Sequence, residues 1–410
     1  MKRRNSTALP QVTITVNGPG EVAGWLQPLV SELRKRQPLI RICVAVVPCV
    51  YSTGLEYDLI RSQTEIDAVC TAKETMSLVF RNRLPPGFHR NGSGFVLHLG
   101  GDSVLTLLLA RRLGQPCLAY VEKPIPMETF FAAVFYSGIW ADSRVAKSNG
   151  KRIIGDMMID AAMMHCRGRL PARSGLNTVG LYPGSRDYLV KFVLPFYAAV
   201  AEKLKTCRTD IEWLLAKSDF LAGDFLRDIP DVNDGRRIEG VNLSWLTEAG
   251  REYVVTPTGI RIEILPHGAV AARAKLVLTL PGSNTAELAA LGVPMIITIP
   301  SWKSELIPWP GLTGHVDRIP FIGKYIKRAV GHLIYRSIGY AAHPNRRIRS
   351  MVVPELVGHI RTGQVVDLVR TMLDSDLRPL EDKLRAVMGP PGATGRLVTE
   401  LQDFLAGDNA

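Results

Sequence analysis

The sequence lacks several patterns that would assign a protein class directly. It contains no apolar run of the roughly 18 residues that indicate a membrane-spanning helix. Its six cysteines are scattered, form no C-x-x-C pair and lie mostly in apolar, strand-like runs. This pattern indicates buried free thiols and argues against a disulfide framework or a cysteine-bound metal. Repeats and low-complexity segments are absent, and basic residues are not interleaved with aromatics, so nucleic acid is the weaker choice of partner.

The amino-terminus also lacks a secretory signal. The basic residues 1–5 precede a short strand pattern and not an apolar segment with a small-residue cleavage site. We therefore expect a cytoplasmic protein. A net charge of +12 favours anionic partners such as nucleotide phosphates or an anionic membrane surface.

The chain has the length and rhythm of two α/β domains. Its 410 residues are 46% hydrophobic and 21% charged, which is typical of globular proteins. Short apolar strand patterns alternate with helical patterns in both halves, and this predicts two parallel-sheet α/β domains. The polar segment 167–175 is the candidate linker. We expect domains at 1–174 and 175–375, with residues 376–410 forming carboxyl-terminal helices.

The most informative segment is residues 280–287, Leu-Pro-Gly-Ser-Asn-Thr-Ala-Glu. It follows an apolar strand pattern and opens a helical pattern that ends at Gly292. Backbone N–H groups and the helix dipole converge at such a turn and suit a phosphate, while Glu287 can accept hydrogen bonds from a sugar diol. An ordinary strand-to-helix turn with an exposed glutamate is an equally good interpretation.

Three further turns follow predicted strands. Residues 183–186 form a tight turn whose guanidinium, Arg186, suits phosphate oxygens. Glu21 lies in a glycine-rich turn that lacks the G-x-G-x-x-G spacing of a dinucleotide site, and it is either an acid or base or a helix-start carboxylate. Asp102 follows the strand 95–99 and is a candidate general base, a helix N-cap, or both.

Two segments mix apolar and basic residues. Residues 74–88 and the amphipathic pattern 319–340 can either contact a membrane surface or pack against the core. The net charge of +12 favours the membrane interpretation for residues 319–340.

Taken together, the motifs resemble those of lipid-A-disaccharide synthases, which are GT-B glycosyltransferases. The resemblance is carried in order along the chain by Gly20–Gly24, Gly155–Ala161, Pro183–Arg186, Gly282–Glu287 with Pro294-Met295, and Pro344-Asn345. It implies two Rossmann-like domains facing a cleft, with the carboxyl-terminal helices crossing back. The first domain would bind the acceptor and the second a UDP-sugar.

The resemblance also implies a reaction and its residues. A glucosamine-type sugar would pass from UDP to a lipid-linked sugar with inversion, without a metal or other cofactor, at the inner face of the cytoplasmic membrane. A homodimer is compatible with it. Asp102 and Glu21 would face the acceptor, with Asp102 the base. The UDP-sugar would be held by Ser185, Arg186, Gly282, Ser283, Asn284, Thr285, Glu287 and Asn345.

The chain departs from the family pattern at three places. Trp25 follows Gly24 where the family has Asp, Pro281 replaces a Ser, and 349–351 replace a Gly-Arg-Glu triplet. A transferase with another glycolipid acceptor, an epimerase acting on UDP-N-acetylglucosamine and a non-catalytic membrane-surface protein therefore remain alternatives. The retained Arg186 and Glu287 argue against the last of these.

Overall fold

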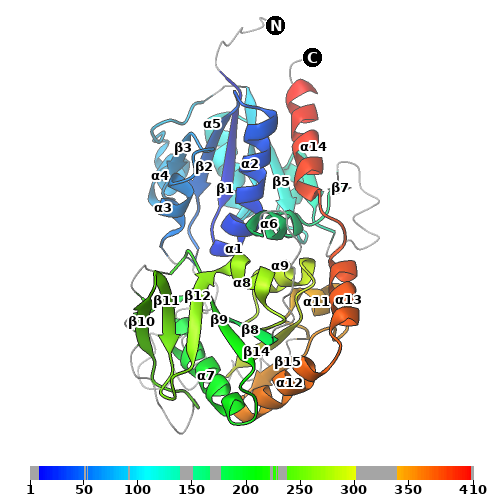
Figure 1. The fold of residues 1–410 in the computed structure, drawn as a ribbon. Helices are drawn as coiled ribbons and strands as arrows, with labels where there is room; N and C mark the ends of the chain where they lie inside the picture. The colour runs from blue at the N-terminus through cyan, green and yellow to red at the C-terminus, as the bar shows by residue number, and fades with distance from the viewer. Residues whose placement is uncertain are drawn as a thin grey trace, which may run out of the picture. The chain divides into compact units, whose positions relative to one another are not determined.

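The computed structural model describes residues 9–49, 52, 54–90, 93–138, 151–166, 177–221, 225–227, 229, 238–301 and 339–407. The chain divides into two compact units: unit 1 comprises Met1–Ala161 and Pro391–Ala410, and unit 2 comprises Ala162–Pro390 (Figure 1). The predicted linker 167–175 and nearly all of the amphipathic pattern 319–340 lie outside the described residues. Among the described helices, none combines the length and apolar character needed to cross a membrane.

Unit 1 is built on a seven-stranded sheet in which every neighbouring pair is parallel, in the order β3-β2-β1-β4-β5-β6-β7. Its strands are β1 (Gln11–Val16), β2 (Arg41–Val46), β3 (Ala68–Cys70), β4 (Gly94–His98), β5 (Cys117–Val121), β6 (Ala133–Tyr136) and β7 (Lys151–Ile153). Its helices are α1 (Pro19–Glu21), the π-helical turn η1 (Val22–Leu26), α2 (Gln27–Arg36), α3 (Glu56–Arg61), α4 (Ala72–Arg81), α5 (Ser103–Leu113), the short η2 (Glu128–Phe130) and α14 (Ala393–Gly407). The helix α6 (Met157–His165) runs across the boundary between the units in sequence.

Side chains alternate between the two faces of this sheet. Val96 of β4 belongs to the core cluster shared with α4 and α5, whereas its neighbour Phe95 makes an edge-to-face contact with Phe404 of α14, at 6.0 Å between ring centroids. The helix α14 also packs against α2 (Figure 1). Asp160 accepts the backbone N–H groups at the start of α14 and fixes its entry. The carboxyl-terminal segment from Pro391 onward thus belongs to unit 1, whereas residues 376–390 of the segment predicted to cross back belong to unit 2.

Unit 2 contains an eight-stranded sheet in the order β10-β11-β12-β9-β8-β13-β14-β15. Its strands are β8 (Asn177–Tyr182), β9 (Ile211–Lys217), β10 (Ser244–Glu248), β11 (Arg251–Val255), β12 (Arg261–Pro266), β13 (Leu276–Thr279), β14 (Met295–Pro300) and β15 (Glu355–Gly358). Its helices are α7 (Asp187–Lys205), α8 (His267–Arg273), α9 (Asn284–Ala290), α11 (His343–Ile348), α12 (Thr362–Asp374) and α13 (Arg378–Met388).

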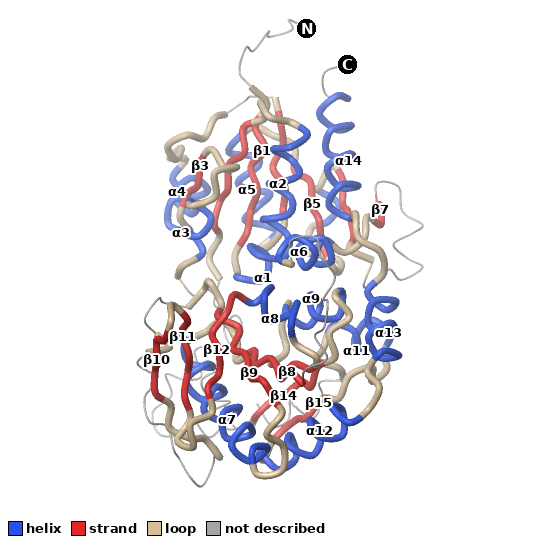
Figure 2. Tube along the Cα trace, viewed as in Figure 1, coloured by secondary structure: helices blue, strands red, loops and turns tan. Residues whose placement is uncertain are grey.

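The predicted parallel α/β class is confirmed for both units, with one addition. The strands β10, β11 and β12 pair antiparallel at one edge of the second sheet (Figure 2). Ala249 and Gly250, both at positive φ, form the two-residue turn that joins β10 to β11. A two-residue hairpin turn with positive φ at both positions matches the twist of the strands it connects.

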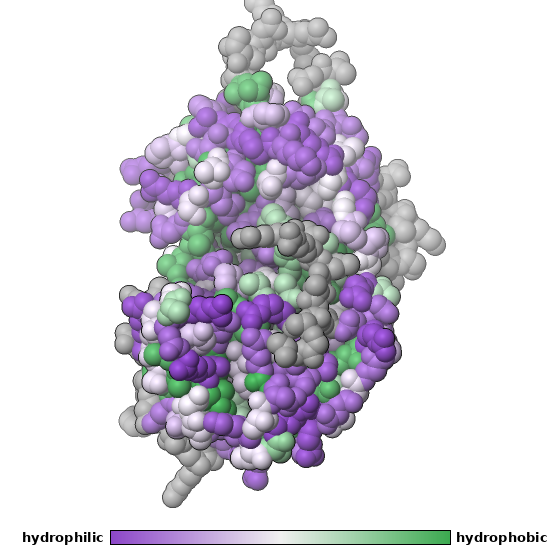
Figure 3. All heavy atoms as spheres, viewed as in Figure 1, coloured by the Kyte–Doolittle hydropathy of each residue, from purple (hydrophilic) through white to green (hydrophobic). Residues whose placement is uncertain are grey.

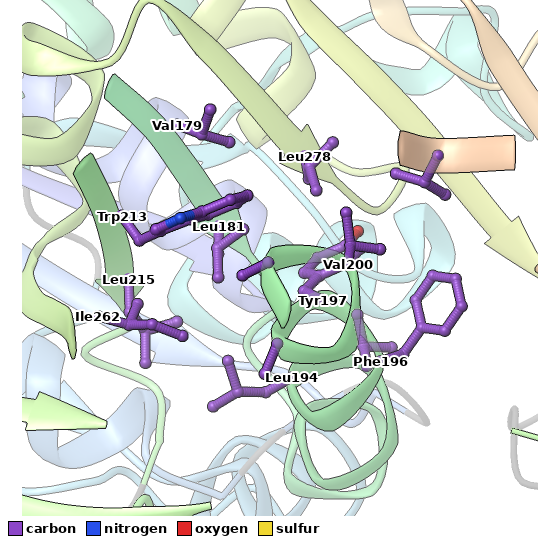
Figure 4. Close-up of a cluster of buried hydrophobic side chains, with 14 of the residues drawn as sticks. Val179, Leu181, Leu194, Phe196, Tyr197, Val200, Trp213, Leu215, Ile262 and Leu278 are labelled. Atoms are coloured by element: carbon purple, nitrogen blue, oxygen red, sulfur yellow. The ribbon is translucent and has the colours of Figure 1, made fainter. Parts of the chain in front are cut away.

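The core of unit 2 lies between its sheet and α7. Leu194, Tyr197 and Val200 of α7 face Trp213 and Leu278 of the sheet (Figure 4), and α12 packs beside α7. On the opposite face, α8 lies close to β8. A Cβ added to Gly180 would stand 2.8 Å from Val270, so glycine permits this close approach.

The solvent-exposed surface over the helices of unit 1 carries mostly polar and charged side chains. The part of the surface seen in Figure 3 over the helices of unit 1 is largely hydrophilic, in agreement with the ion pairs of Glu32 with Lys35 and Arg36 on α2. Exposed ion pairs of this kind contribute little stability, about 0–1 kcal/mol each.

Candidate functional site

The strand order of unit 2 reverses at β8. The chain passes from β8 to β9 on one side, and later places β13 on the other side. Tyr182, the last residue of β8, pairs with Thr279, the last residue of β13. The turns 183–186 and 280–284 therefore leave the sheet next to each other. In open α/β sheets, ligands bind beyond the carboxyl ends of the strands at such a reversal.

Ser185 and Arg186 lie in the first of these turns, where Gly184 has φ +108°. Arg186 is the N-cap residue of α7, a helix of 19 residues, and its side chain is half-buried. The structure thus places the predicted guanidinium at the start of a long helix at the carboxyl edge of the sheet. Both features favour an anion there.

The second turn uses part of its hydrogen-bonding capacity internally. The backbone N–H groups of Thr285 and Glu287 donate to Gly282 and Ser283, at 3.1 and 3.2 Å. The Thr285 hydroxyl donates to the Gly282 carbonyl at 2.8 Å and accepts the His343 N–H at 3.1 Å. Thr285 thus holds the turn together and presents no backbone donor to a phosphate. The amides of Gly282, Ser283 and Asn284 remain the candidate donors.

The Asn284 side chain faces back toward the sheet. Its amide donates to the Thr279 hydroxyl and, at 3.5 Å, to the Leu280 carbonyl. A Cβ added to Gly282 would meet the Asn284 Oδ1 at 2.7 Å, so a larger residue at this position would force the Asn284 side chain to move.

Glu287 is buried, with 9% of its surface exposed, and lies against two histidines. Its Oε2 is 3.3 Å from Nδ1 of His165 at the end of α6, and 3.6 Å from Nε2 of His267 at the start of α8. The two imidazoles approach to 3.1 Å, with an edge-to-face ring geometry. Glu287 was predicted to be an exposed or diol-binding carboxylate, and the structure gives it these two partners.

The electrostatics of the three groups differ although they touch. Burial raises the pKa of Glu287, but the His165 hydrogen bond and the charges of His165 and His267 outweigh it, so the net pKa is lowered. Burial lowers the pKa of His165, but the hydrogen bond and charge of Glu287 and the charge of Asp219 outweigh it and raise the net pKa. For His267 burial prevails over the same carboxylates and lowers the pKa. Divergent pKa values in one cluster are typical of functional sites.

These residues line a pocket in unit 2. The space between its walls is about 220 Å³, part of it open to solvent, and is lined by Ala162, His165, Cys166, Tyr182, His267, Gly268, Ala271, Asn284, Glu287, Leu288 and Leu291. The part of this space that a water-sized molecule can occupy is only about 10 Å³. The pocket thus has room for about one water molecule or an ion, and not for a ribose.

Sequence reasoning selected Glu287 and Asn284 from this pocket and missed His165, His267 and Tyr182. Tyr182 donates its hydroxyl to the His267 carbonyl at 2.5 Å and fixes the start of α8. His165 and His267 each stand alone at the end of an apolar pattern. Nothing in the sequence indicates that these two residues, 102 positions apart, are in contact.

Unit 1 also has a reversal of strand order, at β1, which lies between β2 and β4. The structure brings Glu21 to the turn that follows β4. A Cβ added to Gly100 would meet Glu21 Cγ at 2.8 Å, and one added to Gly18 would meet Glu21 Oε2 at 2.8 Å. The two glycines therefore make room for the carboxylate. The predicted pair Glu21 and Asp102 lies on neighbouring turns at the carboxyl edge of the sheet.

Two buried polar atoms accompany Glu21. Asn17 Oδ1 and Trp25 Nε1 have no hydrogen-bond partner among the described residues. Trp25 lies in the π-helical turn η1 and packs edge-to-face on Tyr120, at 5.5 Å between centroids. π-Helical turns inside helices occur frequently at functional sites, and unpaired buried polar atoms are uncommon in finished interiors.

Asp102 caps helix α5. Its Oδ1 accepts the backbone N–H groups of Val104 and Leu105, at 2.8 and 3.1 Å. The sequence allowed Asp102 to be a cap, a base or both, and the structure shows the cap.

His98 should make unit 1 sensitive to acid. It is buried beside Thr106, 2.9 Å from its hydroxyl, and burial lowers its pKa from 6.5 to about 4 against the opposing charge of Asp102. The unfolded chain then binds the proton first, so the unfolding free energy falls as pH drops from about 6.5 to 4. We expect His98→Gln to remove about 2–3 kcal/mol of the loss between pH 7 and 4.5, from about 1.4 kcal/mol per pKa unit. Urea unfolding at pH 7 and pH 4.5 measures this loss of unfolding free energy. An equal loss in the variant and in the wild type would contradict the prediction.

The last predicted residue, Asn345, is fully buried in α11 of unit 2. Its Nδ2 donates to Val353 O and Glu355 Oε1, and its Oδ1 accepts the N–H groups of Val352 and Val353. These four bonds use both protons and both lone pairs of the amide. The side chain therefore organises the loop after α11 and has no group left for a ligand.

Comparison with known proteins identifies the fold. No family model and no curated protein matches the sequence. Among solved structures, the S. aureus MnaA–UDP co-structure matches with a TM-score of 0.53 and 12% identity over 97% of each chain. The N. meningitidis UDP-GlcNAc 2-epimerase bound to UDP-GlcNAc gives 0.51 and 10% identity over 97% of this chain and all (100%) of that chain. The glycotransferase of kitacinnamycin gives 0.50 and 12% identity, with the same coverage.

At these identities the likeness establishes the fold alone. The chain has the two-unit α/β fold of these solved structures, which include a UDP-GlcNAc 2-epimerase and a glycotransferase.

Proposed function

We propose that this protein is a GT-B glycosyltransferase that moves a glucosamine-type sugar from a UDP donor to a lipid-linked sugar, with inversion at the anomeric carbon. One observation carries the proposal. Two anion-compatible turns leave the sheet of unit 2 from paired residues, Tyr182 and Thr279, with Arg186 in one turn and Glu287 behind the other. A diphosphate flanked by a sugar diol requires this sequence of groups.

The described contacts support specific roles in unit 2. Arg186 and the amides of Gly282, Ser283 and Asn284 bind the diphosphate. Glu287, on the helix that follows the second turn, accepts hydrogen bonds from the ribose hydroxyl groups. As UDP departs, fixed N–H donors, the dipole of α7 and Arg186 stabilise its growing negative charge, which needs no metal at the diphosphate.

Unit 1 supplies the acceptor site in this proposal. A carboxylate takes the proton from the attacking hydroxyl, and Asp102 is the base, with Glu21 beside it on the neighbouring turn.

Residues 74–88 support a lipid acceptor and an anionic membrane surface. The sequence predicted that this segment either contacts a membrane or packs against the core. Leu78 and Val79 of α4 are buried in the core, whereas Phe80 of α4 and Leu84, which follows the helix, are 62% and 40% exposed. Arg81 and Arg83 are exposed beside them. Apolar side chains next to cations suit the surface of an anionic bilayer.

The donor assignment predicts a loss of UDP affinity in Arg186→Ala. Hydrogen bonds to charged groups contribute about 1.5–3 kcal/mol, so the dissociation constant should rise about 10- to 150-fold by calorimetry. Arg370→Ala is the matched control, because Arg370 is an exposed arginine of α12 in the same unit whose only described ion pair is with Asp367. Equal affinities for wild type and Arg186→Ala would refute the assignment.

The proposed reaction is tested by incubating the protein with a panel of UDP-sugars and membrane lipid extracts. We expect UDP release that depends on the lipid, and a glycosylated lipid in the mass spectrum. Absence of UDP binding together with absence of transfer would refute the function.

A second candidate is a UDP-N-acetylglucosamine epimerase. It is favoured by the S. aureus and N. meningitidis structures, which have the same fold and are described with UDP and with UDP-GlcNAc. An epimerase needs no acceptor. If the protein converts UDP-N-acetylglucosamine without a lipid, as detected by nuclear magnetic resonance of the sugar, the epimerase assignment replaces the transferase assignment.

A further inference from the structure

Three potential metal ligands of unit 2 converge on one point. His165 Nδ1, His267 Nε2 and Glu287 Oε2 lie within 4.8 Å of one another, on three different helices. Their separations are 3.1 Å between the imidazoles, 3.3 Å from His165 to the carboxylate and 3.6 Å from His267 to the carboxylate. We propose that these three residues form a binding site for a zinc-class divalent metal ion.

The separations match the coordination geometry. Bonds of about 2.0–2.1 Å at tetrahedral angles place neighbouring ligand atoms about 3.3–3.4 Å apart. The three observed separations lie on both sides of this value and close to it. Two imidazoles and one carboxylate are also the ligand set of several catalytic zinc sites, in which three protein ligands leave a fourth position for water or substrate.

The three atoms all face one point. Hydrogen bonds can join them, because a proton on His165 Nδ1 can be shared between Glu287 Oε2 and the lone pair of His267 Nε2. A cation at the centre would replace that proton, and all three atoms would then act as electron-pair donors.

The surroundings also suit a bound ion. The walls of the pocket are largely apolar, with Ala162, Ala271 and Leu288 among them, so little solvent competes for the ligands. Tyr182 holds the backbone of His267 through its carbonyl, and such outer partners orient metal ligands. The ion would tie the end of α6 to α8 and α9.

The metal site shares Glu287 with the proposed donor site, but it does not depend on the proposed transferase activity. The metal takes Oε2 of Glu287, so any contact of a ribose with this carboxylate would use Oε1. Metal binding is therefore measured in the absence of UDP, and UDP binding is measured with and without metal.

The experiment uses the full-length protein without a histidine tag, stripped with a chelator and then dialysed against Zn²⁺ or Co²⁺. We expect one metal ion per chain by mass spectrometry, and the intense visible absorption of tetrahedral Co²⁺. His165→Gln and His267→Gln should each weaken binding by about 100-fold or more, since even outer partners of a metal site contribute 10- to 100-fold. His359→Gln, an exposed histidine of the same unit, is the matched control and should bind as wild type does.

The Co²⁺ spectrum of the wild type decides the matter even if a variant misfolds. Failure of the wild type to retain one ion per chain, an octahedral spectrum, or unchanged binding in both well-folded glutamine variants would overturn the proposal. If the wild type binds metal but does not bind UDP, the proposed function is overturned and the metal site is not.

Discussion

Replacing Asp102 by asparagine is expected to lower turnover by about 10²- to 10⁴-fold, the usual contribution of a general base. The unfolding free energy should change by less than about 0.5 kcal/mol, because asparagine caps helices as well as aspartate does. The Asn side-chain oxygen can accept the N–H groups of Val104 and Leu105 that Asp102 accepts in the structure. It cannot accept the proton of an attacking hydroxyl. Steady-state kinetics and urea unfolding on the same preparation measure both quantities.

The alanine variant separates the cap from the base. Asp102→Ala removes both functions and should lose about 1 kcal/mol of stability in addition to the activity. Glu21→Gln is the neighbouring control. A large loss of turnover in Glu21→Gln, with near-normal turnover in Asp102→Asn, would transfer the role of base to Glu21 and leave Asp102 as a cap.

Much of the fold could be predicted because local patterns agree with the tertiary structure. The apolar runs that became β1, β4, β8 and β13 are the central strands of the two sheets, and they are buried on both faces. A strand buried on both faces reads as a continuous apolar run, and the helices between such strands require parallel order. The return of α14 to unit 1 came from family resemblance, since no local pattern records it.

Features set by long-range pairing were not predictable. The edge strand β10 is mostly exposed and has no apolar run, and only its pairing with β11 makes it a strand. The partners of Glu287 come from α6 and α8, and no sequence period relates them. The π-helical turn around Trp25 depends on one extra residue in a helix, which leaves the apolar pattern unchanged. Sequence motifs located the strand ends correctly but not what each side chain contacts there.

Asn345 shows most clearly that a residue's position could be predicted from the sequence while its contacts could not. Its substitution should have the largest effect on stability. Asn345→Ala leaves the N–H groups of Val352 and Val353 and the Val353 carbonyl buried without partners. Each such group destabilises by about 1–3 kcal/mol, so we expect a total loss of about 3–5 kcal/mol in urea unfolding. Ser350→Ala, at an exposed position of the same loop, should change stability by less than about 0.5 kcal/mol.

The same variant distinguishes a positioning residue from a ligand contact. Glu355 accepts hydrogen bonds from Asn345 and from the Ala341 and Ala342 amides at the start of α11. The next amide, that of His343, donates to Thr285, beside the turn proposed to bind the diphosphate. Loosening α11 should therefore weaken UDP binding together with stability, and osmolytes that restore the fold should restore both. If Asn345→Ala instead kept its stability and lost UDP affinity alone, Asn345 would contact the donor directly, and the buried bonds seen here would have to open when the donor binds.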